Sequence, residues 1–397
     1  MDELFKQLAE SLSQVSGFIY PNEAELHWAL LVVIYPYLTG LVAGAFILAS
    51  LEKVFKVKEV EPTYRLAMLT ALAFLIVAPM PLLAHLGHPE RSFEIFLTPH
   101  FESAMAMFGF VYAWYLMVVL LLEIWFEYRA DVVKWSESQK GWRRLAYRLI
   151  SLGSNDISPK AVAFDQKAVH TITLIGIPSA FLLHGYVGFI FGSVKANPWW
   201  SSVLMPIVFL FSAIVSGIAL VLLLYYFTTL VRRKTPEMSC LDKLASFLLY
   251  ALIVDLSLET LDFIHRLYES EESIKILSEL IFSKLFLSLT IVQILLGTIG
   301  PILLLAIARF SRLPDELKRV GYFIAALLIQ VGIFSTRWNV VIGGQLFSKS
   351  LRGLTVYKMQ LVGAEGLLVG IGFLILPFLI LFLLVKLLPP WQESRSS

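Results

Sequence analysis

Three acidic residues interrupt an apolar stretch of this 397-residue chain. Asp255, Glu259 and Asp262 are spaced so that a helix would place them within about 60° of one another. Arg266 continues the same face. Ionisable side chains are costly in lipid and usually face a protein interior or a water-filled cavity. Three carboxylates this close repel one another when all are ionised, so at least one is expected to hold a proton near neutral pH. The spacing therefore predicts a route for protons.

A structural role for these acids is the alternative. They would hold helices together if they paired with buried bases such as Lys284, Arg309 or Arg337. Three acids exceed what helix pairing needs, which favours proton transfer. Further steps of a route would use acids near the ends of other spans, namely Glu123 and Glu127 in the third span, Glu52 in the first and Glu365 in the last.

Histidines and aromatic residues form the second group that could do chemistry. Six of the seven histidines are expected at the same end of the membrane spans: His27, His85, His88, His100, His184 and His265. Imidazole, guanidinium and amide donors between aromatic walls suit a flat ligand that presents carbonyl oxygens. A histidine can also transfer a proton while a quinone takes up electrons.

We therefore predict a quinone site at this end of the spans. Its expected residues are His27, Arg91 and His184, with Trp28, His85, Arg337 and Asn339 around them. Tryptophan and histidine are also ordinary residues at membrane interfaces, so simple interfacial anchoring is the alternative for each of them.

The elements that must position these residues are membrane-spanning helices. The chain is 58% hydrophobic and only 16% charged, which is too apolar for the surface of a soluble domain. A helix needs about 20 apolar residues to cross a hydrocarbon core about 30 Å thick. The sequence predicts an all-α integral membrane protein with about nine such helices, in a range of eight to ten. They are expected near 27–51, 64–86, 105–128, 168–192, 203–230, 243–265, 279–308, 317–338 and 360–388.

Basic residues predict how the chain is oriented. Lys and Arg collect in the connections after the first, third, fifth and seventh spans. The positive-inside rule then puts the N-terminus outside and the C-terminus in the cytoplasm, in a cytoplasmic (inner) membrane. We expect four regions: an N-terminal extracytoplasmic segment (1–26), a first bundle with the quinone site (27–192), a second bundle with the buried acids (193–338), and an outer loop, last helix and tail (339–397). The inner loop 129–167 is expected to lie at the membrane interface.

Several classes of function are excluded by composition. Cys240 is the only cysteine, so disulfides, cysteine-bound iron–sulfur clusters and haem attached through C-x-x-C-H are not expected in this chain. No metal site is predicted. The balance of 32 bases against 30 acids gives no reason to expect nucleic acid as a partner. No cleavable signal or twin-arginine motif is visible near the start.

Two segments, together with the aromatic and small-residue pattern of the first span, resemble the NrfD/PsrC family of membrane subunits. One is His85-Leu86-Gly87-His88-Pro89-Glu90-Arg91, between the second and third spans, and the other runs from Arg337 through Gln345. His27 matches the family's histidine near the start of the first span. Arg91 falls where the family has an arginine, although the usual Gly-Arg-Pro reads Gly87-His88-Pro89 here.

The resemblance implies a function as well as a fold. It implies two four-helix bundles and an additional helix, with a pocket for menaquinone or ubiquinone at the outer end of the first bundle. It implies no haem or iron–sulfur cluster within the chain. The expected partners are an extracytoplasmic ferredoxin-like iron–sulfur subunit and a catalytic subunit of molybdopterin or hydrogenase type. Chemistry on the terminal substrate would belong to those partners, so no catalytic residue for it is expected in this chain.

Three other functions stay open at this point. A b-type cytochrome is suggested by His170 and His184, about 21 Å apart on one helix, but no second span offers a matching pair. A single haem at the outer end, held for example by His184 and His85, stays as an alternative. A secondary transporter or a proton or cation channel would use the acids as an ion path, yet no repeated motif is found. A purely structural anchor would leave the buried acids unexplained.

Overall fold

The computed structural model describes residues 15–23, 25–269 and 273–391. Within these residues, nine helical segments are long and apolar enough to cross a membrane. They are Leu30–Lys53, Lys58–His85, Met107–Ser138, Pro159–Gly192, Met205–Val231, Met238–Glu269, Phe286–Phe310, Asp315–Gln345 and Leu367–Leu387. The predicted class, an all-α integral membrane protein with nine spans, is confirmed.

Four of the spans contain more than one helical element. The spans consist of α2 (Leu30–Lys53); η2 (Lys58–Val60), α3 (Glu61–Val77) and α4 (Met80–His85); α6 (Ala104–Trp114), the π-helical η4 (Tyr115–Leu120) and α7 (Leu121–Ser138); α9 (Pro159–Gly192); α10 (Met205–Val231); α11 (Met238–Glu269); the π-helical η6 (Phe286–Ile299) and α13 (Gly300–Phe310); α14 (Asp315–Val341) and η7 (Gly343–Gln345); and α15 (Leu367–Leu387). The connections hold β1 (Ser16–Phe18), η1 (Pro21–Glu23), η3 (Pro89–Arg91), α5 (Glu94–Leu97), α8 (Trp142–Ile150), α12 (Ile274–Glu279), η5 (Leu280–Lys284) and β2 (Arg352–Leu354).

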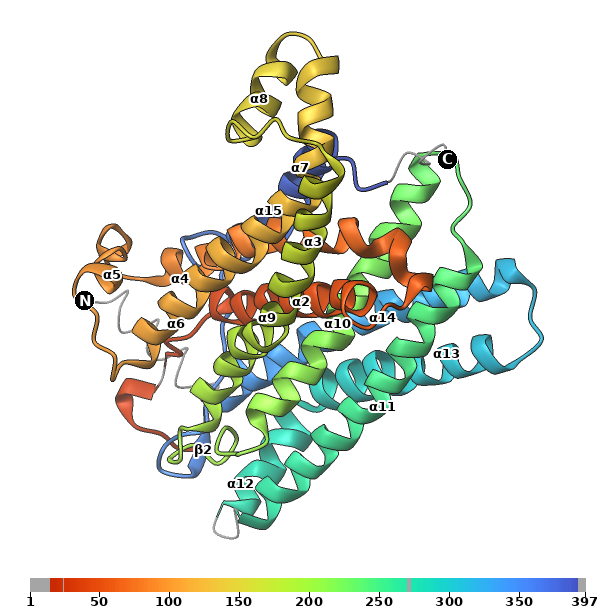
Figure 1. Ribbon diagram of the computed structural model, residues 1–397. Helices are drawn as coiled ribbons and strands as arrows, with labels where there is room; N and C mark the ends of the chain where they lie inside the picture. The colour runs from red at the N-terminus through yellow and green to blue at the C-terminus, as the bar shows by residue number, and fades with distance from the viewer. Residues whose placement is uncertain (1–14, 24, 270–272, 392–397) are drawn as a thin grey trace.

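Helix α2 forms the centre of the molecule. Most of its 24 residues are buried, because α3, α9, α10, α14 and α15 pack around it (Figure 1). The closest approach is to α10, where a side chain on Gly44 would overlap the backbone of Ala213 and Gly217. Small residues allow two membrane helices to approach this closely. The contact brings the first four spans directly against the next four.

The N-terminus of α2 is held by segments far away in the sequence. Its first N–H groups lack a local side-chain cap, which helix ends normally need. The backbone N–H of Trp28 donates to Gln345 Oε1 at 3.0 Å, and that of Leu30 donates to the hydroxyl of Tyr357 at 3.1 Å. Strands β1 and β2 pair antiparallel beside this contact. The segment before the first span is therefore fastened to the loop before the last one.

The predicted inner loop 129–167 is too long. Helix α7 continues to Ser138 and α9 already begins at Pro159, where the side chain of Ser158 caps the helix. Sequence reasoning ended the spans at charged residues, but Arg129 and Asp165 form a buried ion pair of 2.7 Å between these two helices. Because each charge neutralises the other, both helices extend past the apolar stretch. The remaining connection contains α8.

Three other predicted spans also begin elsewhere in the structure. Residues 27–29 and 360–366 are not helical, and 279–284 belong to α12 and η5. The first two segments form extended or turn structure beside the ends of the helices, whereas the third is helical but is separated from η6 at Leu285. Hydrophobicity alone does not distinguish the two outcomes. The division of the chain into domains at residues 26, 192 and 338 stays a prediction.

Candidate functional site

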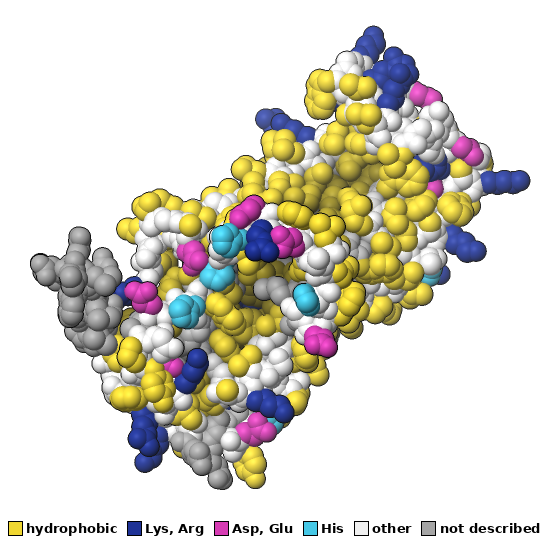
Figure 2. Space-filling model, turned by 90° about the vertical axis from the view of Figure 1, so that its left-hand side faces the viewer, with side chains coloured by type: hydrophobic (Ala, Val, Ile, Leu, Met, Phe, Trp, Pro, Cys, Tyr) yellow, Lys and Arg dark blue, Asp and Glu magenta, His cyan; other side chains and the backbone are white. Residues whose placement is uncertain are grey.

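The two ends of the helical bundle carry different side chains. We call one end the histidine face; it is formed by residues 15–23, 25–29, 86–103, 193–204 and 342–366. The opposite end, the basic face, is formed by residues 54–57, 139–158, 232–237 and 311–314. Figure 2 shows histidines gathered with acidic and basic side chains around a hollow on one side of the molecule. His170 lies near the basic face, where its Nδ1 is 3.1 Å from the carbonyl oxygen of Lys53.

A buried arginine joins the two halves of the molecule. The guanidinium of Arg337 on α14 is fully buried, and its Nη2 donates to Ser212 Oγ on α10 at 2.6 Å. The same nitrogen lies 3.2 Å from His184 Nε2 on α9. His184 Nδ1 is in turn 3.3 Å from Thr39 Oγ1 on α2. One polar cluster thus connects α2 and α9 with α10 and α14. His184 is fully buried about 12 Å below the end of its helix.

Buried acids on α11 face this arginine. Asp255 is 3% exposed, and the charges of Asp255 and Glu259 both act on Arg337. No ion pair joins either acid to Arg337 among the residues that the structure describes. Asp255 Oδ1 and two nitrogens of Arg337 also lack hydrogen-bond partners there. Buried charges that are separated from one another and leave polar atoms without a protein partner are costly, which points to a functional role.

The third acid of the set has a different environment. Asp262 is fully buried and accepts hydrogen bonds from Ser202 and from Arg266 on its own helix. Arg266 also donates to the carbonyl oxygen of Trp199 at 2.5 Å. The expectation that the acids share one face with Arg266 agrees with these contacts. The alternative in which Lys284, Arg309 or Arg337 pairs with the acids is not seen as an ion pair among the described residues.

Amide side chains continue from Glu259 toward α14. Gln293 Nε2 donates to Glu259 Oε2 at 3.2 Å, and Asn339 Nδ2 donates to Gln293 Oε1 at 2.8 Å. Asn339 Oδ1 accepts from Ser288 Oγ at 2.6 Å. A cavity of about 400 Å³ lies beside this chain, lined by Glu259, Arg266, Gln293 and Asn339 among apolar groups. Asn339 therefore belongs with the α11 acids and not with His27.

A pocket of about 230 Å³ opens at the histidine face. His27, Asn197, Trp200 and Gln345 are among its lining residues. The His27 side chain makes no hydrogen bond to another described residue, so its ring nitrogens are available to a ligand. Gly344 at the pocket edge leaves room for Trp200, because a side chain there would overlap the indole. We call this the outer pocket.

Aromatic rings lead from the outer pocket to the buried arginine cluster. Trp28 stacks on Trp200 with ring centres 5.2 Å apart, and Trp200 contacts Phe191 at 5.4 Å. Phe191 contacts Phe209 at 5.9 Å. Phe209 lies 5.7 Å from the His184 ring and 4.2 Å from the Arg337 guanidinium carbon. This aromatic column links two groups of predicted residues that are not in direct contact.

Other predicted site residues lie apart from this column. His85 Nδ1 is 2.7 Å from Glu365 Oε1, which joins the second span to the segment before α15. Arg91 forms an exposed ion pair with Glu94 at 2.8 Å. The hydrogen bond and charge of Arg91 lower the pKa of the Glu94 carboxyl, so this pair stays ionised at neutral pH. Arg91 is thus presented on the surface and does not enter the outer pocket.

A further buried acid lies among the first four spans. Glu123 is fully buried and accepts hydrogen bonds from Thr173 at 2.7 Å and Tyr64 at 3.2 Å. One turn nearer the basic face, Glu127 binds Arg65 at 2.8 Å and Lys53 at 3.3 Å. Glu123 is thus enclosed, whereas Glu127 lies within a network of charges.

Sequence reasoning missed three of the uncharged partners in these clusters. Thr39, Ser212 and Gln293 are separated in the chain by long apolar stretches. Hydroxyl side chains inside membrane helices commonly bond their own backbone, so they attract no attention in a sequence. The available signal was a polar side chain in the middle of each predicted span.

The geometry bears on which cofactors the described residues could hold. Both ring nitrogens of His184 are engaged by Thr39 and Arg337, and His85 is engaged by Glu365. His184, one of the two ligands in the haem alternative, therefore has neither ring nitrogen free. Over the described ranges, no group of three or more His, Cys, Asp or Glu side chains is arranged around a metal position.

The fold and these clusters define a class, a multi-span membrane protein with charged groups buried between its helices. Residues 21–349 match the family model described as Polysulphide reductase, NrfD, and the chain belongs to this family. The predicted family is confirmed.

Three relatives show how far the similarity extends. The chain is 32% identical to a selenate reductase subunit of Mesobacillus selenatarsenatis, over 99% of this chain and 92% of the relative. It is 29% identical to a Putative dimethyl sulfoxide reductase membrane subunit of Halobacterium salinarum, over 59% of this chain and 52% of the relative. It is 23% identical to the Hdr-like menaquinol oxidoreductase integral membrane subunit of Archaeoglobus fulgidus, over 91% of this chain and 84% of the relative.

Proposed function

We propose that this chain is the quinone-reacting membrane subunit of an oxidoreductase complex. Membership of the NrfD family and the names of its relatives support a membrane subunit of an oxidoreductase. The name of one relative includes menaquinol, which supports a quinone as the redox partner in the membrane. The single observation that carries the proposal is the aromatic column between the outer pocket and the cluster of His184 and Arg337.

The outer pocket fits the flat ring of a quinone. A cavity of about 150 Å³ is enough to hold benzene, and this pocket measures about 230 Å³. Trp200 offers an aromatic wall, and His27 offers a nitrogen that could donate to a carbonyl oxygen. Trp28 stacks behind that wall. A naphthoquinone or benzoquinone ring would therefore be held by stacking and by one hydrogen bond from His27.

The side chains around this pocket would manage protons. When bound, a quinone supplies two-electron chemistry that takes up or releases two protons. His27 is exposed at the histidine face, so its imidazole would exchange one proton with the aqueous phase. His184 and Arg337 would hold a positive, polar environment beneath the aromatic column. The roles of His85, Arg91 and Asn339 are proposed as indirect, because these residues lie away from the pocket.

A proton route through the second set of spans completes the proposal. Asp255, Glu259 and Asp262 lie on one helix, and Glu259 continues through Gln293 to Asn339 beside the cavity of about 400 Å³. The charge of Arg337 acts on Asp255 and Glu259, so a change near Arg337 would alter how strongly they hold protons. Glu123 and Glu365 are proposed as entry or exit groups, the first toward the basic face and the second at the histidine face.

Partner subunits would carry the remaining chemistry. We propose that a ferredoxin-like iron–sulfur subunit docks on the histidine face outside the cytoplasmic membrane and passes electrons to a catalytic subunit of molybdopterin or hydrogenase type. Two of the relatives are named as subunits of reductases, which favours quinol oxidation as the physiological direction. The N-terminus would lie outside and the C-terminus in the cytoplasm.

Replacing His27 in the assembled complex tests the pocket. We expect His27→Ala to lower quinol-dependent turnover by at least about 100-fold, the usual contribution of a general acid or base. The matched control is His88→Ala, because His88 is exposed on the same face, pairs with Glu90 and does not line the pocket. Assembly is checked by co-purification of the partner subunits. Full turnover in the His27 variant would place the quinone elsewhere.

A further inference from the structure

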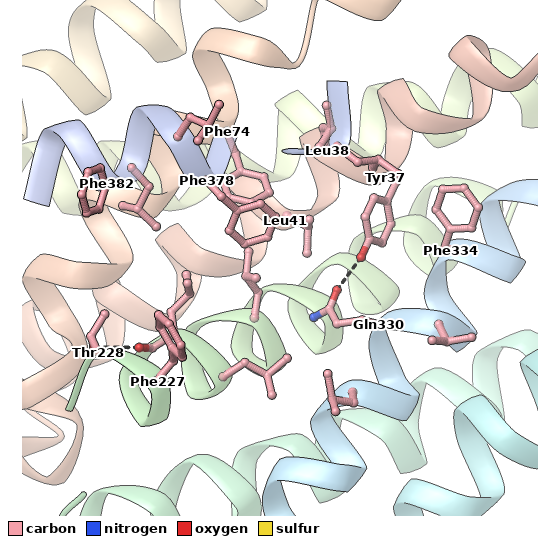
Figure 3. A pocket seen from close by; sticks show the side chains of 18 of the residues that line it. Tyr37, Leu38, Leu41, Phe74, Phe227, Thr228, Gln330, Phe334, Phe378 and Phe382 are labelled. Atoms are coloured by element: carbon pink, nitrogen blue, oxygen red, sulfur yellow. Dashed lines mark hydrogen bonds between the residues drawn. The ribbon is translucent and has the colours of Figure 1, made fainter. Parts of the chain in front are cut away.

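A deep apolar groove opens on the side of the molecule that faces the bilayer. It measures about 970 Å³ and lies between α2, α3, α10, α14 and α15 (Figure 3). Leu38, Phe74, Leu223, Leu327 and Phe378 are among its walls. Helix α15 packs along α3 and α2, and its other side is separated from α10 and α14 by this space. We call it the lateral groove.

The polar groups in the lateral groove are already satisfied. The hydroxyl of Tyr37 donates to Gln330 Oε1 at 2.7 Å, and Gln330 Nε2 donates to the carbonyl oxygen of Ser216 at 2.7 Å. Thr228 bonds the backbone of its own helix at 2.7 Å. A ligand in the groove would therefore meet an apolar wall with little to bind a polar ring. An aliphatic chain is the occupant that such a wall favours.

The length of the lateral groove corresponds to one leaflet of a bilayer. Along α15 its lining runs from Leu374 to Val385, which is about 16 Å by helical rise. Half of a hydrocarbon core about 30 Å thick is about 15 Å. Figure 3 places Tyr37 and Phe334 toward one end of the groove and Thr228 and Phe382 at the other. The second end is the one nearer the basic face, because α10 and α15 both end there.

Two cations stand at that end of the lateral groove. Arg232 follows Thr228 by one helical turn, and its guanidinium lies 4.1 Å from the ring of Trp391. Lys386 Nζ lies 4.2 Å from the ring of Phe382, which lines the groove. Neither cation has an ion-pair partner in the part of the chain that the structure describes. An anionic phospholipid suits this arrangement, because its headgroup is attracted to the two positive charges and its acyl chain to the apolar lateral groove.

We propose that the lateral groove is a binding site for an anionic phospholipid of the leaflet at the basic face. One acyl chain lies between α15 and the pair α10 and α14, and the phosphate lies between Arg232 and Lys386. The lipid then fills the gap between the last span and the rest of the bundle. This inference is independent of the quinone proposal, because no residue of the outer pocket contributes to it.

Lipid titration with detection by native mass spectrometry tests the site. The full chain, with any partner subunits that remain bound, is titrated with phosphatidylglycerol and with phosphatidylcholine that has the same acyl chains. We expect phosphatidylglycerol to bind about 30-fold more tightly, since each basic side chain near an anionic group contributes about fivefold. The double variant Arg232→Gln with Lys386→Gln should lose this preference. The control variant Arg309→Gln with Arg312→Gln, at the same face but outside the groove, should keep it.

A second pair of variants tests the acyl chain. Leu379→Trp would fill the groove from α15, whereas Leu383→Trp places the same bulk on an exposed position of that helix outside the groove. We expect the first to lower binding of both phospholipids and the second to leave binding unchanged. Equal affinity for the two headgroups in the unaltered chain would overturn the proposal. So would displacement of phosphatidylglycerol by menaquinone, which would assign the groove to an isoprenoid tail.

Discussion

Arg337 is the residue on which the interior of this molecule depends. It is fully buried, it bonds Ser212 and His184, and the charges of two acids on α11 act on it. Leaving a buried charge without its counterpart is far more costly than the pair itself is stabilising. The positions of Asp255 and Arg337 are therefore coupled, and a change in the charge of one is felt by the other. Arg337 thus lies between the end of the aromatic column and the acids on α11.

Neutralising Asp255 tests whether the acids carry protons. In the assembled complex, reconstituted in sealed vesicles, we expect Asp255→Asn to abolish proton translocation while quinone turnover continues. The asparagine keeps the size of the side chain but holds no exchangeable carboxyl proton. The measurement is the ratio of protons moved to electrons transferred.

The control for this experiment lies on the same helix. Glu269 is exposed at the end of α11, so Glu269→Gln removes a carboxylate without touching the interior. In the Glu269→Gln variant, the ratio of protons moved to electrons transferred should equal that of the unaltered complex. Unchanged translocation in the Asp255 variant would leave these acids with a structural role only.

The crossing of α2 and α10 is the critical feature at the scale of elements. The two helices approach so closely that a side chain on Gly217 would overlap the backbone of Gly44 and Ala45. This approach sets the distance between His184 and Arg337, because α9 packs on α2 and α14 packs on α10. Close backbone contact between small residues thus positions the polar cluster.

Enlarging Gly217 should separate these helices. We expect Gly217→Leu to lower the free energy of unfolding by about 3 kcal/mol, at the upper end of what overpacking usually costs. The measurement is the midpoint of unfolding in mixed micelles with increasing dodecyl sulfate. Gly372→Leu is the matched control, since a side chain at Gly372 meets no atom within 4 Å. Equal stability of the two variants would contradict the close contact.

The distribution of charge gives the whole molecule a direction. One end presents histidines, acids and the outer pocket (Figure 2), while the other presents the amphipathic helix α8 (Figure 1). The two cations of the lateral groove also lie toward this second end. On α8, Trp142, Leu145 and Leu149 are exposed beside Arg144 and Arg148. Such a helix favours the headgroup region of a membrane, which supports its predicted interfacial role.

Thiol labelling tests the predicted orientation. Cys240 is buried, so a single introduced cysteine reports on its own position. In intact cells that make this subunit alone, an impermeant maleimide should label His100→Cys but should label Lys140→Cys only after the membrane is opened. Both positions are exposed in connections, at opposite ends of the bundle. Labelling in the reverse order would invert the orientation and move the proposed iron–sulfur partner to the other side.

Residue types and their spacing determined much about this protein without a structure. Continuous apolar stretches required helices, because lipid offers no partner to an unpaired backbone group. Asp255, Glu259 and Asp262 had to share one face of their helix, because their spacing of four and three residues is close to one helical turn each. The motif around His85 and the segment after Arg337 were enough to indicate the NrfD family, which the match over residues 21–349 confirmed.

Only the tertiary structure decided which distant residues meet. His184, Thr39, Ser212 and Arg337 come from four helices, and no local pattern encodes which faces those helices turn toward one another. The same holds for the separation of Asn339 from His27 and for the exposure of Arg91. Periodicity fixes the face of a helix that is polar, but the partner of that face depends on the packing of all the helices together, which follows from close backbone contacts such as Gly44 against Gly217.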